Sequence, residues 1–116
     1  MAGGLNPRRG EVWYADLDPV VGHEQGGRRP VLIVSADHLN AGPAEIVIAL
    51  AITSIDRGII WHTPVQPPEG GLRMRSVIMC EDIRAISKQR LGRQLGTVSD
   101  DTMAQVEFNL QRLLDI

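Results

Sequence analysis

The stretch "PVLIVSA" (residues 30–36) decides the fold of this 116-residue chain. A continuous apolar run of strand length predicts a strand that is buried on both faces or closed into a barrel. "EIVIALAIT" (45–53) is a second run of this kind. If the two strands are antiparallel neighbours, Arg29 before the first and Thr53 at the end of the second lie at the same end of the sheet.

Shorter segments outside these two runs also have strand composition. They are "EVWYADL" (11–17), "GIIWHTPV" (58–65), "SVIMCEDIRAI" (76–86) and "RQLGTV" (93–98). We expect 58–65 to pair with 45–53 across the turn "SIDR", and "SKQRL" (87–91) to form a helical turn. The two prolines and two glycines of 66–75 exclude regular structure there.

The last segment changes its period from strand to helix. Ser99 suits an N-cap, and Asp100 and Asp101 complement the dipole of the first turn. Apolar residues then recur on one face, at Met103, Val106, Leu110 and Leu113. The sequence therefore predicts a mainly β domain: a small barrel or half-barrel of five to seven antiparallel strands with a C-terminal amphipathic helix.

The composition is that of an ordinary globular domain, 43% hydrophobic and 22% charged. A single cysteine, Cys80, excludes an intrachain disulfide and favours a reducing cytoplasm. We find no signal peptide, and no apolar run approaches the ~20 residues of a membrane-spanning helix. We therefore expect a cytoplasmic protein with no membrane partner.

The net charge of −2 argues against a nucleic-acid ligand, but its distribution weakens that objection. Residues 99–116 carry four acids against Arg112 alone, and every basic residue except Lys88 is arginine. The planar, permanently charged guanidinium of arginine is well suited to binding phosphate groups. A GC-rich genome would explain the same bias, so composition alone does not decide the ligand.

The sequence lacks the motifs of metal-binding and nucleotide-binding sites. His23, His38, His62 and Cys80 have no metal-ligand spacing, and "GHEQGG" is neither a Walker nor a GxGxxG loop. Cys80 lies in an apolar run and is interpreted as core, and His62 as a satisfied or edge histidine.

What remains is the loop in "HEQGGRRPVLIVS" (23–35). It brings together Glu24, Gln25, Arg28 and Arg29, with two glycines that allow a close bend. The loop is either a solvated hairpin loop or a functional site. Arg29 favours the interpretation as a functional site, because Pro30 and the strand that follows fix its backbone. A preorganised cation stabilises developing negative charge more effectively than a mobile one. Thr53 and Ser54 add two hydroxyls at a second strand end.

At this point the chain resembles a known family. "RRGEVWYADLDPVVGHEQGGRRPVLIVSAD" (8–37), "ALAITS" (49–54) and "SVIMCEDIRAISKQRLGRQLGTVS" (76–99) are similar to MazF/PemK-type toxins, the ribonuclease halves of bacterial toxin–antitoxin pairs. The resemblance implies a Src-homology-3-like barrel and a homodimer with RNA along its interface. Residues 8–116 would form one toxin domain after a flexible tail, 1–7.

The resemblance also implies metal-independent cleavage of single-stranded RNA at a short preferred sequence, without a cofactor. The family's essential arginine falls on Arg29, its hydroxyl on Thr53 and its loop acid on Glu24. Without a metal, the nucleophile is the RNA's own 2′-hydroxyl, which would leave a 2′,3′-cyclic phosphate and a 5′-hydroxyl. Glu24 and His23 are both candidates for the general base.

Other residues are expected to bind RNA or to select bases. The expected RNA-binding residues are His23, Gln25, Arg28, Ser54, Arg57, Arg73 and Arg75. The available stacking rings are Trp13, Tyr14 and Trp61, each more often a core residue. Arg75 and Asp82 depart from residues common in the family and are expected to affect cleavage-sequence preference.

Two other classes remain open. A CcdB-like gyrase-inhibiting toxin shares the fold but acts through a tryptophan near its C-terminus, whereas this sequence ends "QRLLDI". A catalytically silent binding barrel is the other. The resemblance further implies a MazE-like antitoxin whose disordered, acidic C-terminal tail occupies the RNA groove.

Overall fold

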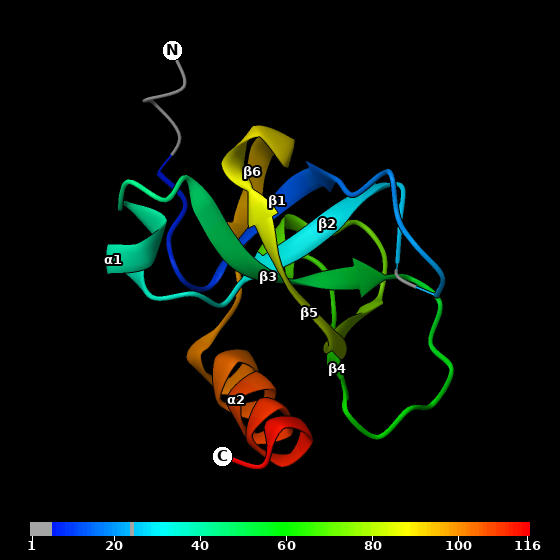
Figure 1. Ribbon diagram of the computed structural model, residues 1–116. Helices are drawn as coiled ribbons and strands as arrows, with labels where there is room; N and C mark the ends of the chain where they lie inside the picture. The colour runs from blue at the N-terminus through cyan, green and yellow to red at the C-terminus, as the bar shows by residue number, and fades with distance from the viewer. Residues whose placement is uncertain (1–5, 24) are drawn as a thin grey trace.

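The computed structural model describes residues 6–23 and 25–116 and shows one strongly bent antiparallel sheet with a helix against it (Figure 1). The sheet has six strands in the order β4-β5-β3-β2-β1-β6. The strands are β1 (Glu11–Asp16), β2 (Arg28–Ile33), β3 (Ile46–Thr53), β4 (His62–Val65), β5 (Ser76–Ser87) and β6 (Leu91–Thr97). The helices are α1 (Asp37–Asn40) and α2 (Asp100–Leu114), with 3₁₀ turns η2 (Glu69–Gly71) and η3 (Lys88–Arg90).

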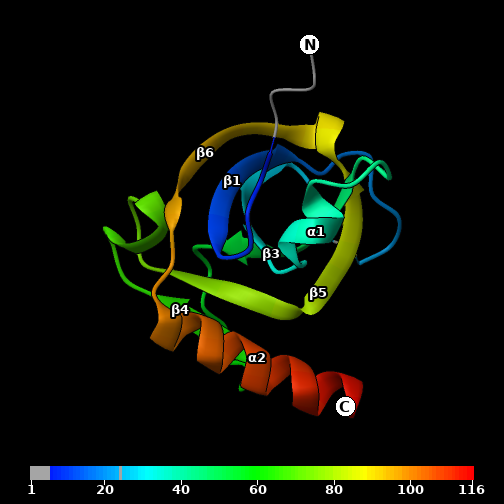
Figure 2. The ribbon, with the colours of Figure 1, turned by 90° about the vertical axis from the view of Figure 1, so that its left-hand side faces the viewer.

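The predicted fold class is confirmed. The strands curl around a common interior, with α2 outside the curl and α1 near one end (Figure 2). β4 and β6 are the two ends of the hydrogen-bonded order, so the sheet is a half-barrel rather than a closed ring. The predicted helical turn is also present, as η3.

Strand pairing follows the prediction at the centre of the sheet and differs from it at one edge. β2 and β3 are antiparallel neighbours, with Val31 opposite Ala51. The pairing expected between 58–65 and 45–53 was wrong: β4 is shorter, His62–Val65, and pairs with β5. The physical reason is that β2 and β5 already occupy both edges of β3, so β3 has no free edge for β4.

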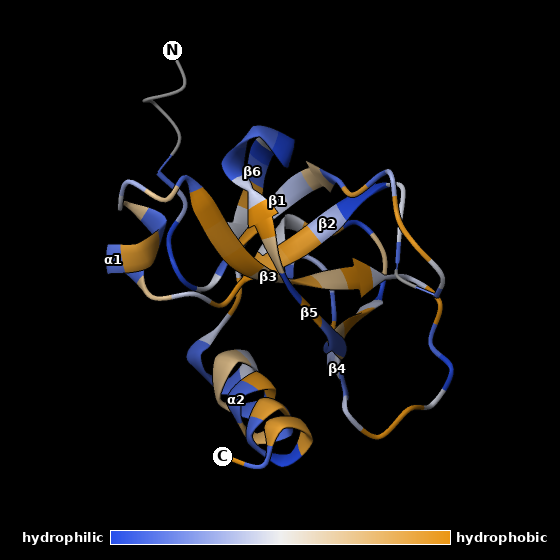
Figure 3. Cartoon of the chain, viewed as in Figure 1, coloured by the Kyte–Doolittle hydropathy of each residue, from blue (hydrophilic) through white to orange (hydrophobic). Residues whose placement is uncertain are grey.

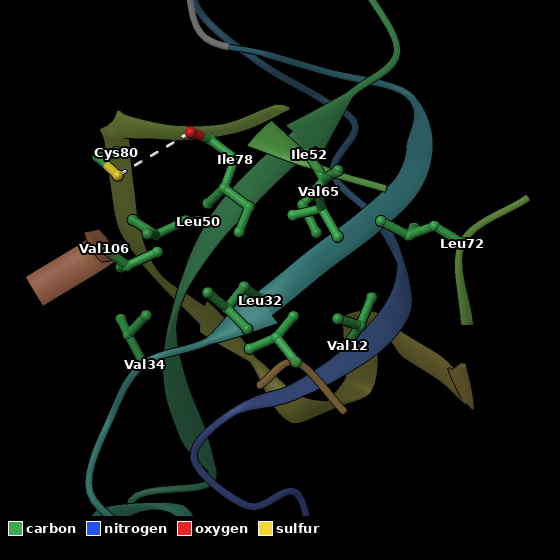
Figure 4. Packing of buried hydrophobic residues seen from close by; sticks show 11 residues of the cluster. Val12, Leu32, Val34, Leu50, Ile52, Val65, Leu72, Ile78, Cys80 and Val106 are labelled. Carbon is green, nitrogen blue, oxygen red and sulfur yellow. Dashed lines mark hydrogen bonds between the residues drawn. The ribbon is translucent and has the colours of Figure 1, made fainter. Parts of the chain in front are cut away.

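Apolar side chains pack on both faces of β2 and β3, as their continuous apolar runs require. One cluster, around Leu32, Leu50 and Ile52, fills the interior of the curl (Figure 4). A second cluster, which includes Val31, Ile33 and Ala49, lies on the opposite faces of the strands. Figure 3 shows the apolar character concentrated along β2 and β3. Each large buried side chain contributes about 1.5–3 kcal/mol of transfer free energy, so these strands are the rigid part of the fold.

α2 has the predicted cap and apolar face. The Ser99 side chain accepts a hydrogen bond from the Thr102 amide at 3.1 Å, and Val106 is completely buried. The face also contains a polar anchor that the pattern did not indicate: Asn109 is buried and donates to the Thr63 hydroxyl at 3.0 Å. α2 is thus fixed to the sheet by apolar packing and by a buried hydrogen bond.

The segment 66–75, which we expected to be irregular, contains the single 3₁₀ turn η2 packed against β6. The approach is close: a Cβ on Gly71 would lie 1.9 Å from the Leu95 carbonyl oxygen. Only glycine fits there. Of the predicted flexible tail 1–7, residues 1–5 lie outside the described part of the chain, and Pro7 is buried.

Glu69 joins η2 to α2. Its carboxylate accepts from the Ser99 amide at 2.8 Å and from the Thr102 hydroxyl at 2.6 Å. Burial acts to raise the pKa of Glu69, but these hydrogen bonds outweigh it and hold the pKa below its usual value.

Glu69→Gln is therefore expected to lower the free energy of unfolding at pH 7 by about 1 kcal/mol, because the charged acceptor of two hydrogen bonds is lost at a partly buried site. A lowered folded-state pKa stabilises the fold above the unfolded-state pKa, and that contribution disappears as the pH falls through the folded-state value. Urea unfolding at several pH values should show the wild type and the variant converging below about pH 4. A difference that stays constant down to pH 2 would contradict this account.

Candidate functional site

A cleft of about 600 Å³ lies where the loops at one end of the sheet meet. Four arginines line it, Arg28, Arg29, Arg73 and Arg93, and no carboxylate lines it among the residues that the structure describes. The other lining residues are Tyr14, Pro30, Ile52, Thr53, Ser54, Ile55, Gly71, Leu72, Met74, Ser76 and Leu95. We call this cleft the arginine groove.

Arg29 is the most constrained cation of the arginine groove. It lies on β2, opposite Ala15 of β1. Its Nε donates to the Gly26 carbonyl at 2.7 Å, and its Nη1 lies 3.4 Å from the Ile52 carbonyl oxygen. The guanidinium is thus aimed by a strand behind it and by two carbonyls beside it. Arg29 and Pro30 both lie within β2, so regular strand structure includes the Arg29 backbone.

Thr53 ends β3 next to Arg29. The register of β2 and β3 ends with Val31 opposite Ala51, and Arg29 and Thr53 follow beyond this last pair on their own strands. Both residues line the arginine groove. The Thr53 Oγ1 accepts from the Ile55 amide at 3.2 Å, which orients the hydroxyl at the strand end. The structure therefore brings together the guanidinium and the hydroxyl that the sequence predicted at one end of the sheet.

The loop between β1 and β2 closes over this end. The Leu17 amide donates to the Gly27 carbonyl and the Gly27 amide to the Asp18 carboxylate, each at 2.9 Å. Gly26 has no room for a side chain, because a Cβ there would lie 2.8 Å from Asp18 Oδ1 and 3.1 Å from the Val20 methyls. Glu24, the predicted loop acid, lies outside the described residues, and His23 is exposed on the loop.

The predicted RNA-binding residues divide into two groups. Arg28, Ser54 and Arg73 line the arginine groove, as do Arg29 and Thr53. His23, Gln25, Arg57 and Arg75 are not among its described lining residues.

Two of the charged residues in and around the groove have carboxylate partners. Arg28 lies 3.7 Å from an Asp16 carboxylate oxygen. Arg75 pairs with Asp56 at 3.0 Å, and the pKa of Asp56 is lowered, first by the Gly58 amide and then by Arg75.

Of the three aromatic residues expected to stack, only Tyr14 lines the arginine groove, with 39% of its surface exposed. Trp13 is buried in the second apolar cluster, and Trp61 lies outside the described lining. Arg93 and Met74 were missed by sequence reasoning. Arg93 reaches the groove only because β6 pairs with β1, and no local pattern predicts that pairing.

Asp82 was expected near the RNA groove, but it is not among the described lining residues. It instead pairs with Arg84 at 2.6 Å, and both side chains are largely buried.

The interpretations of Cys80 and His62 fit the structure. Cys80 is completely buried in the core, and burial raises the pKa of its thiol, so it is a poor nucleophile. His62 is an edge histidine, since β4 ends the strand order; its Nε2 lies 2.8 Å from the Glu81 carboxylate, and its buried Nδ1 has no hydrogen-bond partner among the described residues. Among the described residues, no three His, Cys, Asp or Glu side chains gather at one point. None of the described helices is long and apolar enough to cross a membrane.

The fold and the groove together define a class: a small β-rich protein whose cationic cleft suits a phosphate-bearing ligand. Comparisons with known proteins agree with this class. Residues 8–114 match the family of PemK-like, MazF-like toxins of type II toxin–antitoxin systems. The chain is 40% identical over 105 residues to the endoribonuclease EndoA of Bacillus subtilis, covering 90% of each sequence.

Solved structures show the same likeness. A crystal structure of MazF from Deinococcus radiodurans superimposes with a TM-score of 0.87 at 28% identity, over 97% of this chain and 99% of that one. A mycobacterial endoribonuclease in complex with its cognate antitoxin gives 0.78 at 28% identity, over 95% and 96%. The chain therefore belongs to the MazF/PemK family of toxins of toxin–antitoxin systems.

Gly26→Ala is expected to displace the β1–β2 loop, because the new methyl group would overlap the Asp18 carboxylate. Amide hydrogen exchange should show faster exchange at Gly27, whose amide depends on Asp18, while β3 keeps its protection. Gly92→Ala is the matched control, since its Cβ would meet its nearest neighbour, the Tyr14 carbonyl, at 3.4 Å. Equal effects of the two substitutions would show that Gly26 has no special steric role.

Proposed function

We propose that this toxin is a metal-independent endoribonuclease that cleaves single-stranded RNA at a preferred short sequence. The observation that carries the proposal is the meeting of Arg29 and Thr53 in a groove lined by four arginines. Guanidinium groups fit phosphate oxygens through paired hydrogen bonds. The 40% identity to an endoribonuclease supports the same reaction.

The proposed reaction is attack of the RNA's own 2′-hydroxyl. The 2′-oxygen forms a bond to the adjacent phosphorus and loses its proton to a base, while the bond from phosphorus to the 5′-oxygen breaks and that oxygen gains a proton. The products are a 2′,3′-cyclic phosphate and a 5′-hydroxyl. No outside nucleophile or metal is needed, and DNA is not a substrate because it lacks the 2′-hydroxyl.

Arg29 and Thr53 have separate roles in this reaction. Arg29 neutralises the charge that builds on the phosphoryl oxygens. Arginine side chains carry a permanent positive charge in proteins, so charge stabilisation is a better role than proton donation. Thr53 hydrogen-bonds the phosphate or orients the ribose. The loop supplies the base, for which Glu24 and His23 are the two candidates.

RNA binding is proposed along the arginine groove, with Arg28, Arg73 and Ser54 at the backbone and Tyr14 stacking on a base. His23, Gln25, Arg57 and Arg75 are proposed to contact RNA beyond the groove. We further propose a homodimer with RNA along its interface. A MazE-like antitoxin would place its acidic tail in the same groove; the mycobacterial relative is in complex with its cognate antitoxin.

The purified protein is expected to cut a long single-stranded RNA in excess EDTA and to leave 5′-hydroxyl ends. Arg29→Ala is expected to reduce the rate by about 100-fold or more, the usual cost of removing a preorganised stabilising group. Thr53→Val, which keeps the side-chain shape, should also impair cleavage. Mapping the new ends also identifies the preferred sequence.

Arg112→Ala is the charge-matched control, because Arg112 lies on α2 over the Phe108 ring. A substrate with a single 2′-deoxy residue before the scissile phosphate should resist cleavage. Cleavage of that substrate, or loss of wild-type activity in EDTA, would contradict the proposed mechanism. If no RNA is cut, a gyrase assay tests the alternative of a non-enzymatic toxin.

An acidic peptide with the sequence of the antitoxin tail is expected to compete with RNA, because both would neutralise the same arginines. Titration of a fluorescent, non-cleavable RNA analogue with the peptide should displace the RNA completely. Simultaneous binding of both with undiminished affinity would contradict a shared groove.

A further inference from the structure

A largely buried ion pair lies beneath the β1–β2 loop, outside the described lining of the arginine groove. Arg84 lies on β5 opposite Ala49 of β3, and its side chain is 18% exposed. Its Nη2 donates to the Asp82 carboxylate at 2.6 Å and to the Gln25 carbonyl at 2.6 Å. A guanidinium this buried requires hydrogen-bond partners of this kind. The contact between β5 and the loop therefore stabilises the buried charge of Arg84.

The contact adjoins the group that aims Arg29. Gln25 and Gly26 are consecutive residues, and the Gly26 carbonyl accepts the 2.7 Å bond from Arg29 Nε. The Gln25 carbonyl shares a planar peptide unit with the Gly26 Cα, which carries the Gly26 carbonyl, so a shift of the Gln25 carbonyl displaces the point to which that acceptor is attached. The Asp82–Arg84 pair thus reaches Arg29 through two neighbouring backbone carbonyls.

A second arginine, close to the end of β5, contacts the part of the loop that follows β1. Arg90, in η3, donates from Nη1 to the Asp16 carbonyl at 3.2 Å and to the Asp18 carbonyl at 2.5 Å. The end of β5 and η3 therefore fix both arms of the loop. Only the Arg84 contact adjoins the carbonyl that Arg29 uses.

We propose that Arg84, held by Asp82, is a positioning residue for RNA cleavage: it fixes the Gln25–Gly26 backbone so that the Arg29 guanidinium is aimed at the scissile phosphate. The inference rests on the proposed ribonuclease function. Arg84 acts through Arg29 rather than on RNA, because its charge is paired with Asp82. Asp82 thereby has a role in geometry.

The test is steady-state cleavage of RNA by Arg84→Met, Arg84→Lys, Asp82→Asn and the double variant Asp82→Asn/Arg84→Met. Arg84→Met should lower kcat on the order of 10- to 100-fold, the cost of a small misplacement of a catalytic group. KM should stay within about twofold, because phosphate binding along the groove is kept. Arg84→Lys should recover part of the rate, and the double variant should be no slower than Arg84→Met.

Arg9→Met is the matched control. Arg9 also donates to a backbone carbonyl, that of Val34, and to a carboxylate, Glu107, but it does so beside α2. Its substitution should cost similar stability and leave kcat unchanged. Hydrogen exchange at Leu17 and Gly27 reports the loop independently of RNA, and it should be faster in Arg84→Met than in Arg9→Met.

The outcomes separate the two proposals. Unchanged kcat in Arg84→Met, with an active wild type, would overturn the positioning role alone. A rise in KM at constant kcat would instead make Arg84 a binding residue and would also overturn it. Absence of cleavage by the wild type would overturn the proposed function, and this inference with it.

Discussion

The antiparallel pairing of β2 with β3 is the constraint on which the candidate site depends. These two strands occupy the middle of the sheet, carry apolar residues on both faces and are bonded to neighbours on both edges. A one-residue slip in their register would turn Arg29 or Thr53 away from the arginine groove and would expose the core. The same burial that stabilises the fold therefore holds the guanidinium beside the hydroxyl. The packing of the core therefore sets the positions of the site residues.

Several arginines of this protein donate hydrogen bonds to backbone carbonyls. Arg29, Arg84 and Arg90 each donate to a backbone carbonyl around the β1–β2 loop, and each of the three reaches two acceptors. A planar fork with five donors can do this, whereas a lysine ammonium is a compact point charge. The arginine bias, which composition alone left unexplained, thus has structural uses beside the groove.

Charge is separated within the fold. The net charge is −2, yet the described lining of the arginine groove carries four arginines and no carboxylate. Acids of α2, such as Asp100 and Glu107, lie beside Arg9 around a separate pocket. Local field, rather than net charge, decides what a cleft attracts. This is why the acidic total did not exclude a polyanionic ligand.

The sequence by itself determined the elements whose signals are local. Apolar runs defined β2 and β3, a cap and a 3.6-residue period defined α2, and strand ends placed Arg29 and Thr53 at one end of the sheet. The contribution of Arg93 to the groove, the pairing of β4 with β5 and the burial of Asp82 with Arg84 came only from the tertiary structure. These features depend on which strand edges remain free and on how the sheet bends. Both are set by contacts between residues far apart in the chain, which no local pattern encodes.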